Sequence, residues 1–222
     1  MDQTNLEFFK ACSSGDFAKV CALISKGVNV DVCKNDGRTG LMKSAKRGYV
    51  EIVRILIDNG ADVNKRDFNN KTALMGASKK GHIDIVKLLV ESKCDINARD
   101  NNNRTSLMRA AFLGKLDVVE YLVEHGANVN DTDTKGRTAL MEAVLAFKVD
   151  TIHYLINNGS NIDAQDNNGC TCLMRASYGG YTDLVIYLLN KGANKDIQDY
   201  ENNKAIHYVR EHCFMDLKEY LK

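Results

Sequence analysis

Three sequence landmarks recur every 33 residues, and this period constrains the fold more than any other feature of the chain. Glycines follow short helix-like runs at Gly15, Gly48, Gly81, Gly114 and Gly180, and Phe147 stands where the period expects another. Tetrads of the form Thr-x-Leu-Met begin at Thr39, Thr72, Thr105, Thr138 and Thr171. Segments such as GADVN and GANVN keep the same spacing. A fixed period of about 20–50 residues is typical of proteins built from stacked repeats.

One unit shows the predicted local structure. The hydroxyl of Thr72 is placed to cap a first helix, and Gly81 can adopt the left-handed conformation that ends it. A second helix is predicted over residues 83–90, with a wide buried stripe made by Ile83, Val86, Leu88, Leu89 and Val90. Neither helix reaches the roughly 12–15 residues that an isolated helix needs, so each unit must be stabilised by its neighbours.

These features resemble the ankyrin repeat, and the resemblance spans essentially the whole chain. It rests on the period, the Thr-x-Leu start and the segments GHIDIVKLLV and GADVNKRD. The usual Thr-Pro-Leu-His reads Thr-x-Leu-Met here, and histidine occupies that place only at His207. The resemblance implies an all-α solenoid of helix-turn-helix units, with hairpin-like turns at right angles to the helices. We expect one domain, 1–222, with units at about 4–35, 36–68, 69–101, 102–134, 135–167, 168–200 and 201–222, the first and last acting as caps.

Composition narrows the compartment and the partners. Thirty basic residues nearly balance 29 acidic ones, but residues 1–111 carry a net charge of +6 and residues 112–222 a net charge of −5. No apolar run approaches the roughly 18 residues of a membrane span, and the first residues lack a secretory pattern. Seven cysteines without a pairing framework favour reduced thiols. We therefore expect a cytoplasmic monomer, with a nuclear or secreted-effector location left open.

The sequence contains none of the common catalytic motifs. It lacks the P-loop, the dinucleotide-binding glycines, HExxH and GxSxG. Cys170 and Cys172, with Cys213 distant, are too few for a structural zinc site. His207 and His212 are five residues apart and do not share a helical face. We predict no catalytic residue, no metal and no cofactor.

The resemblance also names the binding surface, because ankyrin repeats usually bind partners along a concave groove lined by the first helices and the turn tips. Transferred by the 33-residue period, the predicted partner-binding residues fall on both elements. On the first helices they are Lys43, Lys46, Arg47, Lys79, Lys80, Arg109, Phe112, Leu113, Glu142, Leu145, Ala146, Arg175, Tyr178 and Tyr208. On the turns they are Arg38, Phe68, Lys71, Arg104, Arg137 and Tyr200.

This surface is basic at first, apolar around Phe112 and Leu145, and tyrosine-rich at its end. Aromatic and arginine anchors are typical of binding hot spots, and a basic flank steers an acidic partner. We therefore predict a non-catalytic scaffold for an acidic, partly apolar protein. The alternatives are a proteasome-assembly chaperone of the gankyrin kind and a secreted effector of a pathogen or symbiont. A nucleic-acid partner is disfavoured, because no aromatic residues are interleaved with the lysines.

Two residues stand where other units have glycine. Phe147 replaces the glycine after a first helix, and Lys93 replaces the glycine after a second helix. Either the first helix of that unit continues past its usual end, or Phe147 adopts a left-handed conformation at a cost of about 1–2 kcal/mol. Both alternatives place the Phe147 ring beside Leu145.

Overall fold

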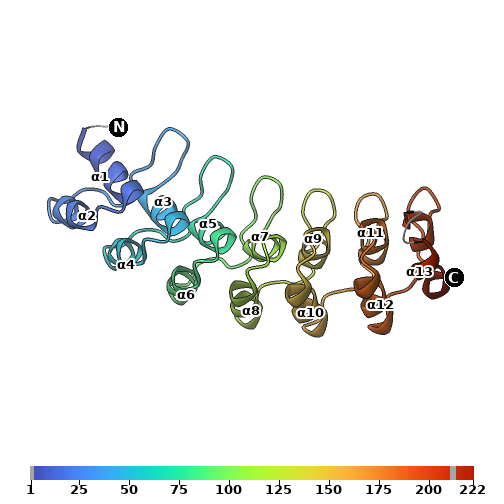
Figure 1. Cartoon of the computed structure of the whole chain (residues 1–222). Coiled ribbons are helices and arrows are strands. Elements are labelled where there is room, and N and C mark those ends of the chain that lie inside the picture. Colours follow the sequence, from blue (N-terminus) through green and yellow to red (C-terminus); the bar gives the residue numbers. More distant parts are fainter. Residues whose placement is uncertain (1–2, 211–213) are drawn as a thin grey trace.

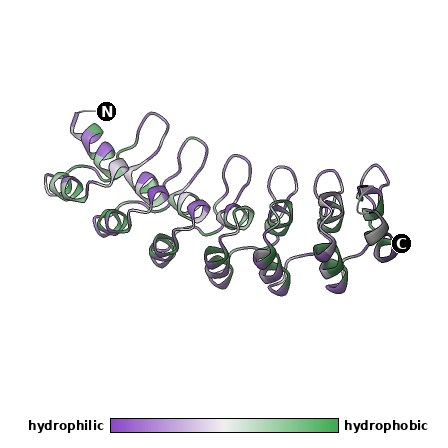
Figure 2. Cartoon of the chain, in the orientation of Figure 1, coloured by the Kyte–Doolittle hydropathy of each residue, from purple (hydrophilic) through white to green (hydrophobic). Residues whose placement is uncertain are grey.

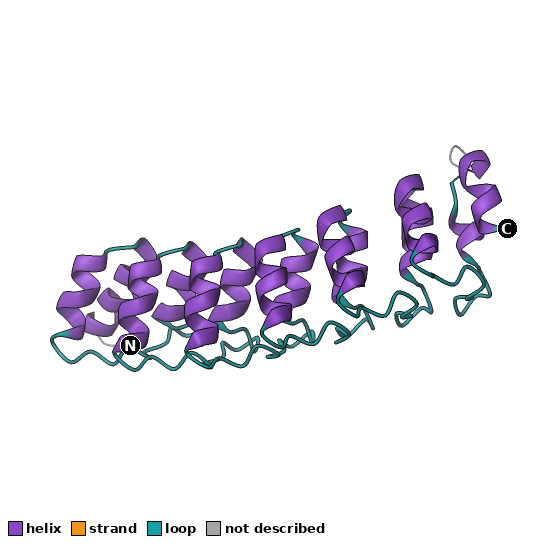
Figure 3. Ribbon diagram, turned by 90° about the horizontal axis from the view of Figure 1, so that it is seen from below, coloured by secondary structure: helices purple, strands orange, loops and turns teal. Residues whose placement is uncertain are grey.

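The computed structural model describes residues 3–210 and 214–222 and consists of paired helices joined by loops (Figure 1). In chain order the helices are α1 (Gln3–Ser14), α2 (Phe17–Ile24), α3 (Gly40–Arg47), α4 (Val50–Asp58), α5 (Ala73–Lys80), α6 (Ile83–Glu91), α7 (Ser106–Phe112), α8 (Leu116–Glu124), α9 (Ala139–Leu145), α10 (Val149–Asn157), α11 (Cys172–Gly179), α12 (Thr182–Asn190), the 3-10 turn η1 (Ala205–Tyr208) and α13 (Phe214–Leu221). Figure 3 draws no strand in the described residues. The predicted all-α class is confirmed. His212 and Cys213, which were considered above as metal ligands or site residues, lie outside the described residues.

The helices form two rows. Figure 1 shows α1, α3, α5, α7, α9 and α11 in an inner row, between the projecting loops and the outer row of even-numbered helices. The array curves toward the loops, so the inner helices and the loops share its concave side. The predicted solenoid is confirmed, while the bounds of the individual units stay a prediction.

The tetrads begin the inner helices as predicted. The hydroxyl oxygens of Thr39, Thr72, Thr105, Thr138 and Thr171 each accept a hydrogen bond from the backbone N–H of the methionine three residues later. These bonds satisfy one of the free amides at each helix start. At the other end of α5, Gly81 has a φ of 79° and ends the helix in the left-handed conformation.

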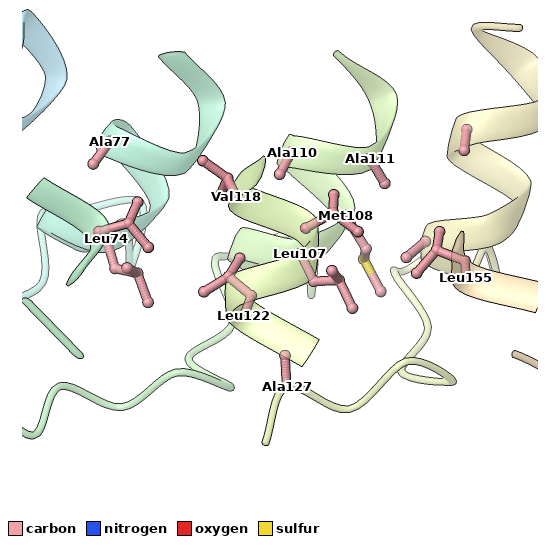
Figure 4. Packing of buried hydrophobic residues seen from close by; sticks show 14 of the residues in the cluster. Leu74, Ala77, Leu107, Met108, Ala110, Ala111, Val118, Leu122, Ala127 and Leu155 are labelled. Atoms are coloured by element: carbon pink, nitrogen blue, oxygen red, sulfur yellow. The ribbon is translucent and has the colours of Figure 1, made fainter. Parts of the chain in front are cut away.

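The core lies between the two rows and continues through the whole array. Figure 4 shows Leu107 and Met108 of α7 packed near Leu122 of α8, with Leu74 and Leu155 of neighbouring units on either side. All five side chains are fully buried or nearly so. Each helix pair therefore completes its core only through the next pair, as the short helices require.

The buried stripe of α6 is narrower than the sequence predicts. Ile85, Val86 and Leu89 are fully buried, whereas Ile83, Leu88 and Val90 are only half-buried and pack at its edge. The prediction therefore missed Ile85. A short outer helix has one side open to solvent, so its flanking apolar residues pack against neighbours without being fully enclosed.

The loops pair with one another through the backbone. The N–H of Phe68 donates to the carbonyl of Asp36, and the same bond recurs from Asn101 to Asn69 and from Tyr200 to Asn168. In Figure 3 the loops run as a continuous strip along one edge of the helices. Each loop thus holds the next at a fixed spacing, and together they form one wall of the concave side.

Candidate protein-binding groove

The predicted site residues lie on the inner helices, at their ends or in the loops, so they share the concave side (Figure 1). They differ in their exposure and in their partners. Some side chains are free, and others are held by buried carboxylates of the protein itself. This difference decides which of them can meet a partner.

The basic part of the groove is formed by α3, α5 and the loops before them. Lys46, Arg47, Lys79 and Lys80 are exposed, while Lys43 is half-buried. Figure 2 shows more hydrophilic ribbon on α3 and α5 than on α9. Partial burial, with repulsion from Arg38, lowers the pKa of Lys43. Burial also lowers the pKa of Lys79, with Arg109 and Lys46 as the next causes. These cations lie close together without enough negative charge to balance them.

Arg38 and Lys71 line the same region from the loops and are half-buried. The guanidinium of Arg38 lies 3.3 Å from the carboxylate of Asp36 and 3.4 Å from that of Asp67. Phe68, at the tip of the next loop, is 73% exposed. Its ring is available to a partner because it has no role in the core.

Four arginines predicted as partner-binding residues are instead held by buried carboxylates: Arg104, Arg109, Arg137 and Arg175. Arg109 pairs with Asp100, and Arg175 pairs with Asp166. Arg137 binds Asp133 through Nη2 at 2.8 Å and Nε at 3.1 Å. The prediction that these arginine side chains are freely exposed is therefore wrong. A guanidinium held in this way is pre-positioned, but much of its charge is already neutralised.

Each of these carboxylates is buried because it organises its own loop. The Asp133 carboxylate accepts the backbone N–H of Lys135 at 2.8 Å and that of Arg137 at 3.0 Å. Burial alone would raise the pKa of Asp133, but the hydrogen bonds from Arg137 and Lys135 lower it below its ordinary value. A buried anion needs a cation beside it, and an arginine of the groove supplies it. Aspartates at this place in the period are Asp67, Asp100, Asp133, Asp166 and Asp199.

Glu142 is the clearest correction. The sequence predicts it as a partner-binding residue of the groove, yet it is 1% exposed. It pairs with Arg104, and its Oε1 lies 3.0 Å from Nη1 of Arg137. Arg104 and Arg137 belong to consecutive loops, so Glu142 joins two repeats across the groove. Arginine side chains from both loops cover the carboxylate, which explains its burial.

The apolar part of the groove begins at Phe112 and Leu145, which are 37% and 46% exposed. Their exposure on the inner helices agrees with the prediction. Leu113 and Ala146, one residue further on, are half-buried at the helix ends. The guanidinium of Arg104 lies 5.9 Å from the centroid of the Phe112 ring. The exposed apolar side chains of Phe112 and Leu145 thus lie next to the paired arginines of the groove.

Phe147 adopts the left-handed alternative. Its φ is 51°, and α9 ends at Leu145 instead of continuing. The ring packs on Tyr181 of the next unit, with centroids 4.2 Å apart. Phe147 therefore contacts the neighbouring repeat, while its expected position beside Leu145 stays a prediction. Lys93 also has a positive φ, of 61°.

The tyrosine-rich end surrounds an apolar pocket of about 240 Å³, lined by Leu145, Cys170, Met174, Arg175, Tyr178 and Tyr208. Tyr178 and Tyr200 are 57% and 72% exposed. Tyr208 is half-buried instead: its hydroxyl donates to Asp199 and lies 3.2 Å from the sulfur of Cys170. The bond to Asp199 raises the pKa of Tyr208 above its ordinary value, with the Cys170 contact as the second cause.

Sequence reasoning missed the buried Asp network, although a signal for it was present. Arg109 follows Asp100 by nine residues, and Arg175 follows Asp166 by the same distance. The 33-residue period repeats this spacing, so it predicts a loop carboxylate paired with a residue of the following helix. In the described part of the chain, no cluster of three or more histidine, cysteine or acidic residues could hold a metal ion. Every helix there is too short or too polar to span a bilayer.

A model of ankyrin repeats, in three copies, matches residues 8–100, 67–133, 107–199 and 143–214. The chain belongs to the ankyrin repeat family. Among solved structures, it is similar to the ankyrin repeat domain of Bcl-3, a member of the IkappaB protein family, with 25% identity over 96% of this chain and 97% of that one and a TM-score of 0.84. It also resembles the human ASB11 ankyrin repeat domain in fold, with 21% identity, 94% and 96% coverage and a TM-score of 0.83. No curated protein sequence matches it. Ankyrin repeat domains are in general protein–protein interaction modules.

Proposed function

We propose that this ankyrin repeat protein is a non-catalytic scaffold that binds an acidic, partly apolar partner protein along its concave groove. The observation that carries the proposal is the exposure of Phe112 and Leu145 on neighbouring inner helices, adjoining lysines that lack balancing charge. An apolar patch of this kind on a solvent-facing groove favours a binding role. The basic end would accelerate encounter with an acidic surface.

We assign different roles in partner binding to the basic and the apolar parts of the groove. The lysines of α3 and α5 supply long-range attraction, which salt weakens. Phe112, Leu145 and the pocket beside Tyr178 supply the apolar contacts that resist dissociation. The paired arginines between them present fixed donors, because their carboxylate partners hold them in place.

The compartment and assembly state complete the proposal. We place the protein in the cytoplasm as a monomer, supported by six described cysteines that are all free thiols. An assembly chaperone of the gankyrin kind and a secreted effector are finer alternatives, and no described residue favours either of them.

The test is affinity capture from the native cell, comparing the wild-type chain with the double variant Phe112→Ala and Leu145→Ala. A matched control is Phe17→Ala with Val149→Ala, which removes similarly exposed apolar side chains at the starts of outer helices. We expect the groove variant to lose the captured protein and the control to retain it. Equal capture by both variants would refute Phe112 and Leu145 as the centre of the site.

A further inference from the structure

One position of the groove is vacant in a single unit. The residue after the Met of each tetrad, or its equivalent, lies on an inner helix or on η1 and is elsewhere large: Lys43, Arg109, Glu142, Arg175 and Tyr208. In α5 this residue is Gly76. The missing side chain leaves a hollow of about 130 Å³. This volume is several times the roughly 10–15 Å³ that one water molecule requires.

The hollow is surrounded by basic side chains: Arg38, Lys43, Lys46, Lys71, Lys79 and Arg109. The single carboxylate in its lining is Asp67. That carboxylate is already engaged, because its Oδ1 accepts the N–H groups of Asn69 and Lys71 and its Oδ2 lies 3.4 Å from Arg38. Arg38 and Arg109 are paired with Asp36 and Asp100 outside the lining, so the unbalanced positive charge among the described residues is that of Lys43, Lys46, Lys71 and Lys79.

The surrounding lysines are destabilised as cations by this arrangement. Burial, followed by repulsion from neighbouring cations, lowers the pKa of both Lys43 and Lys79. Lys46, Lys71 and Lys79 have no salt bridge to a carboxylate within residues 3–210 and 217–222. An anion seated in the hollow would relieve the repulsion between them.

We propose that the Gly76 hollow binds the phosphoryl group of a phosphorylated side chain, carried by the partner segment that lies in the groove. A phosphoryl group brings a charge of about −1.5 to −2 and three acceptor oxygens, which suits several converging lysines better than one carboxylate does. The identity of the carrier rests on the proposed function, whereas the anion site rests on the hollow alone.

The surroundings favour a protein segment over other sources of phosphate. The residues that line the hollow belong to α3, α5, α7 and the loops before α3 and α5. These elements lie on the concave side in Figure 1, which a flat bilayer cannot enter. None of the residues that line it is aromatic, so bases of a nucleic acid would have no ring on which to stack. The groove continues from the hollow toward Phe112, so a bound segment can extend in that direction.

The repeat itself supplies a variant that fills the hollow without removing charge. Asp100 pairs with Arg109 and Asp166 pairs with Arg175, each nine residues later, and Gly76 stands nine residues after Asp67. In Gly76→Arg the new guanidinium is therefore expected to pair with Asp67. The backbone of Gly76 is helical, and a Cβ there would lie 3.3 Å from the Cβ of Lys46, so a shift of a few tenths of an ångström accommodates it.

The experiment is a titration of the ¹⁵N-labelled full chain, followed by NMR chemical shifts. The probes are the pentapeptide Gly-Gly-phosphoSer-Gly-Gly, the same peptide with serine, and inorganic phosphate. We expect saturable shifts around Gly76 with the phosphopeptide and none with the serine peptide. Identical shifts with both peptides, or tighter binding of inorganic phosphate than of the phosphopeptide, would overturn the proposal.

Three variants separate a built site from general attraction. Gly76→Arg adds a positive charge, yet it should weaken phosphopeptide binding by more than about tenfold because the hollow is filled. Lys79→Gln should weaken binding by roughly fivefold. Lys87→Gln, at an exposed lysine of the outer helix α6 in the same repeat, removes the same charge outside the groove and should leave the affinity nearly unchanged. Equal losses in Lys79→Gln and Lys87→Gln, or unchanged binding in Gly76→Arg, would refute the site.

These results are independent of the groove test. If Gly76→Arg loses the phosphopeptide but Phe112→Ala with Leu145→Ala still captures its partner, the anion site stands and the apolar centre is wrong. If the phosphopeptide does not bind while partner capture depends on Phe112 and Leu145, the scaffold stands and this inference fails.

Discussion

Replacing Glu142 by glutamine should destabilise the protein by about 2–3 kcal/mol. Glu142 is 1% exposed and pairs with Arg104 and with Arg137. Hydrogen bonds to charged groups contribute roughly 1.5–3 kcal/mol each. The glutamine carbonyl can still accept from one arginine, but its NH₂ would face the donors of the other. Arg137 keeps Asp133, so the main loss falls on Arg104, whose salt bridge among the described residues is the one to Glu142.

The partial exposure of the arginines limits how much Glu142→Gln can destabilise the protein. The side chain of Arg104 is 26% exposed, so water can reach it once its partner is lost. The penalty therefore stays below the roughly 3–5 kcal/mol found when a fully buried charge is left alone. For a chain of this size, about 2–3 kcal/mol corresponds to a fall in Tm of roughly 4–12 °C.

The assay is urea unfolding followed by circular dichroism, with Glu124→Gln as the control. Glu124 is exposed at the end of α8, so the same substitution should change stability by less than about 0.5 kcal/mol. A double-mutant cycle of Glu142→Gln with Arg104→Gln should give a coupling energy of at least about 1 kcal/mol. A coupling near zero would show that Glu142 does not join the two repeats.

Three further predictions concern packing, backbone and thiols. Leu122→Ala should lower the free energy of unfolding by about 2–5 kcal/mol in urea titrations, because the side chain is fully buried. Lys93→Gly should raise the free energy of unfolding by roughly 0.5–1 kcal/mol, because glycine adopts a positive φ without strain. Gly126→Lys, at the equivalent place, should lower the free energy of unfolding. A loss of stability in Lys93→Gly or a gain in Gly126→Lys would contradict this reasoning. Burial raises the pKa of Cys172 to about 12 from 9.0, so the folded state favours the neutral thiol. The contribution of this thiol to the free energy of unfolding should therefore be complete below about pH 9 and should be lost between about pH 9 and 12. At pH 8 a thiol reagent should accordingly modify the exposed Cys33 of the native protein long before it modifies the buried Cys172.

The helical architecture could be predicted because its signals are local. Thr72 and Gly81 bracket a helix through contacts within a few residues, and the structure places both caps as expected. The period then repeats this unit, so a correct interpretation of one unit extends to its neighbours. Ile85 was missed because the extent of a buried stripe depends on which neighbouring helices cover it.

The candidate site could be located but not resolved. The 33-residue period correctly brought Phe112 and Leu145 to the solvent-facing side of the inner helices. It could not separate free lysines from neutralised arginines. Arg104 and Glu142 are 38 residues apart in sequence and meet only when consecutive repeats stack.

The sequence by itself determined the helices, their ends and the stacking of the repeats, since these follow from capping and burial within about 33 residues. Only the tertiary structure decided which charges are available. A cation and an anion neutralise each other when they lie within about 4 Å, whatever their separation along the chain. The stacking of repeats therefore pairs Arg109 with Asp100 and Glu142 with Arg104. It leaves lysines without such partners around the hollow at Gly76.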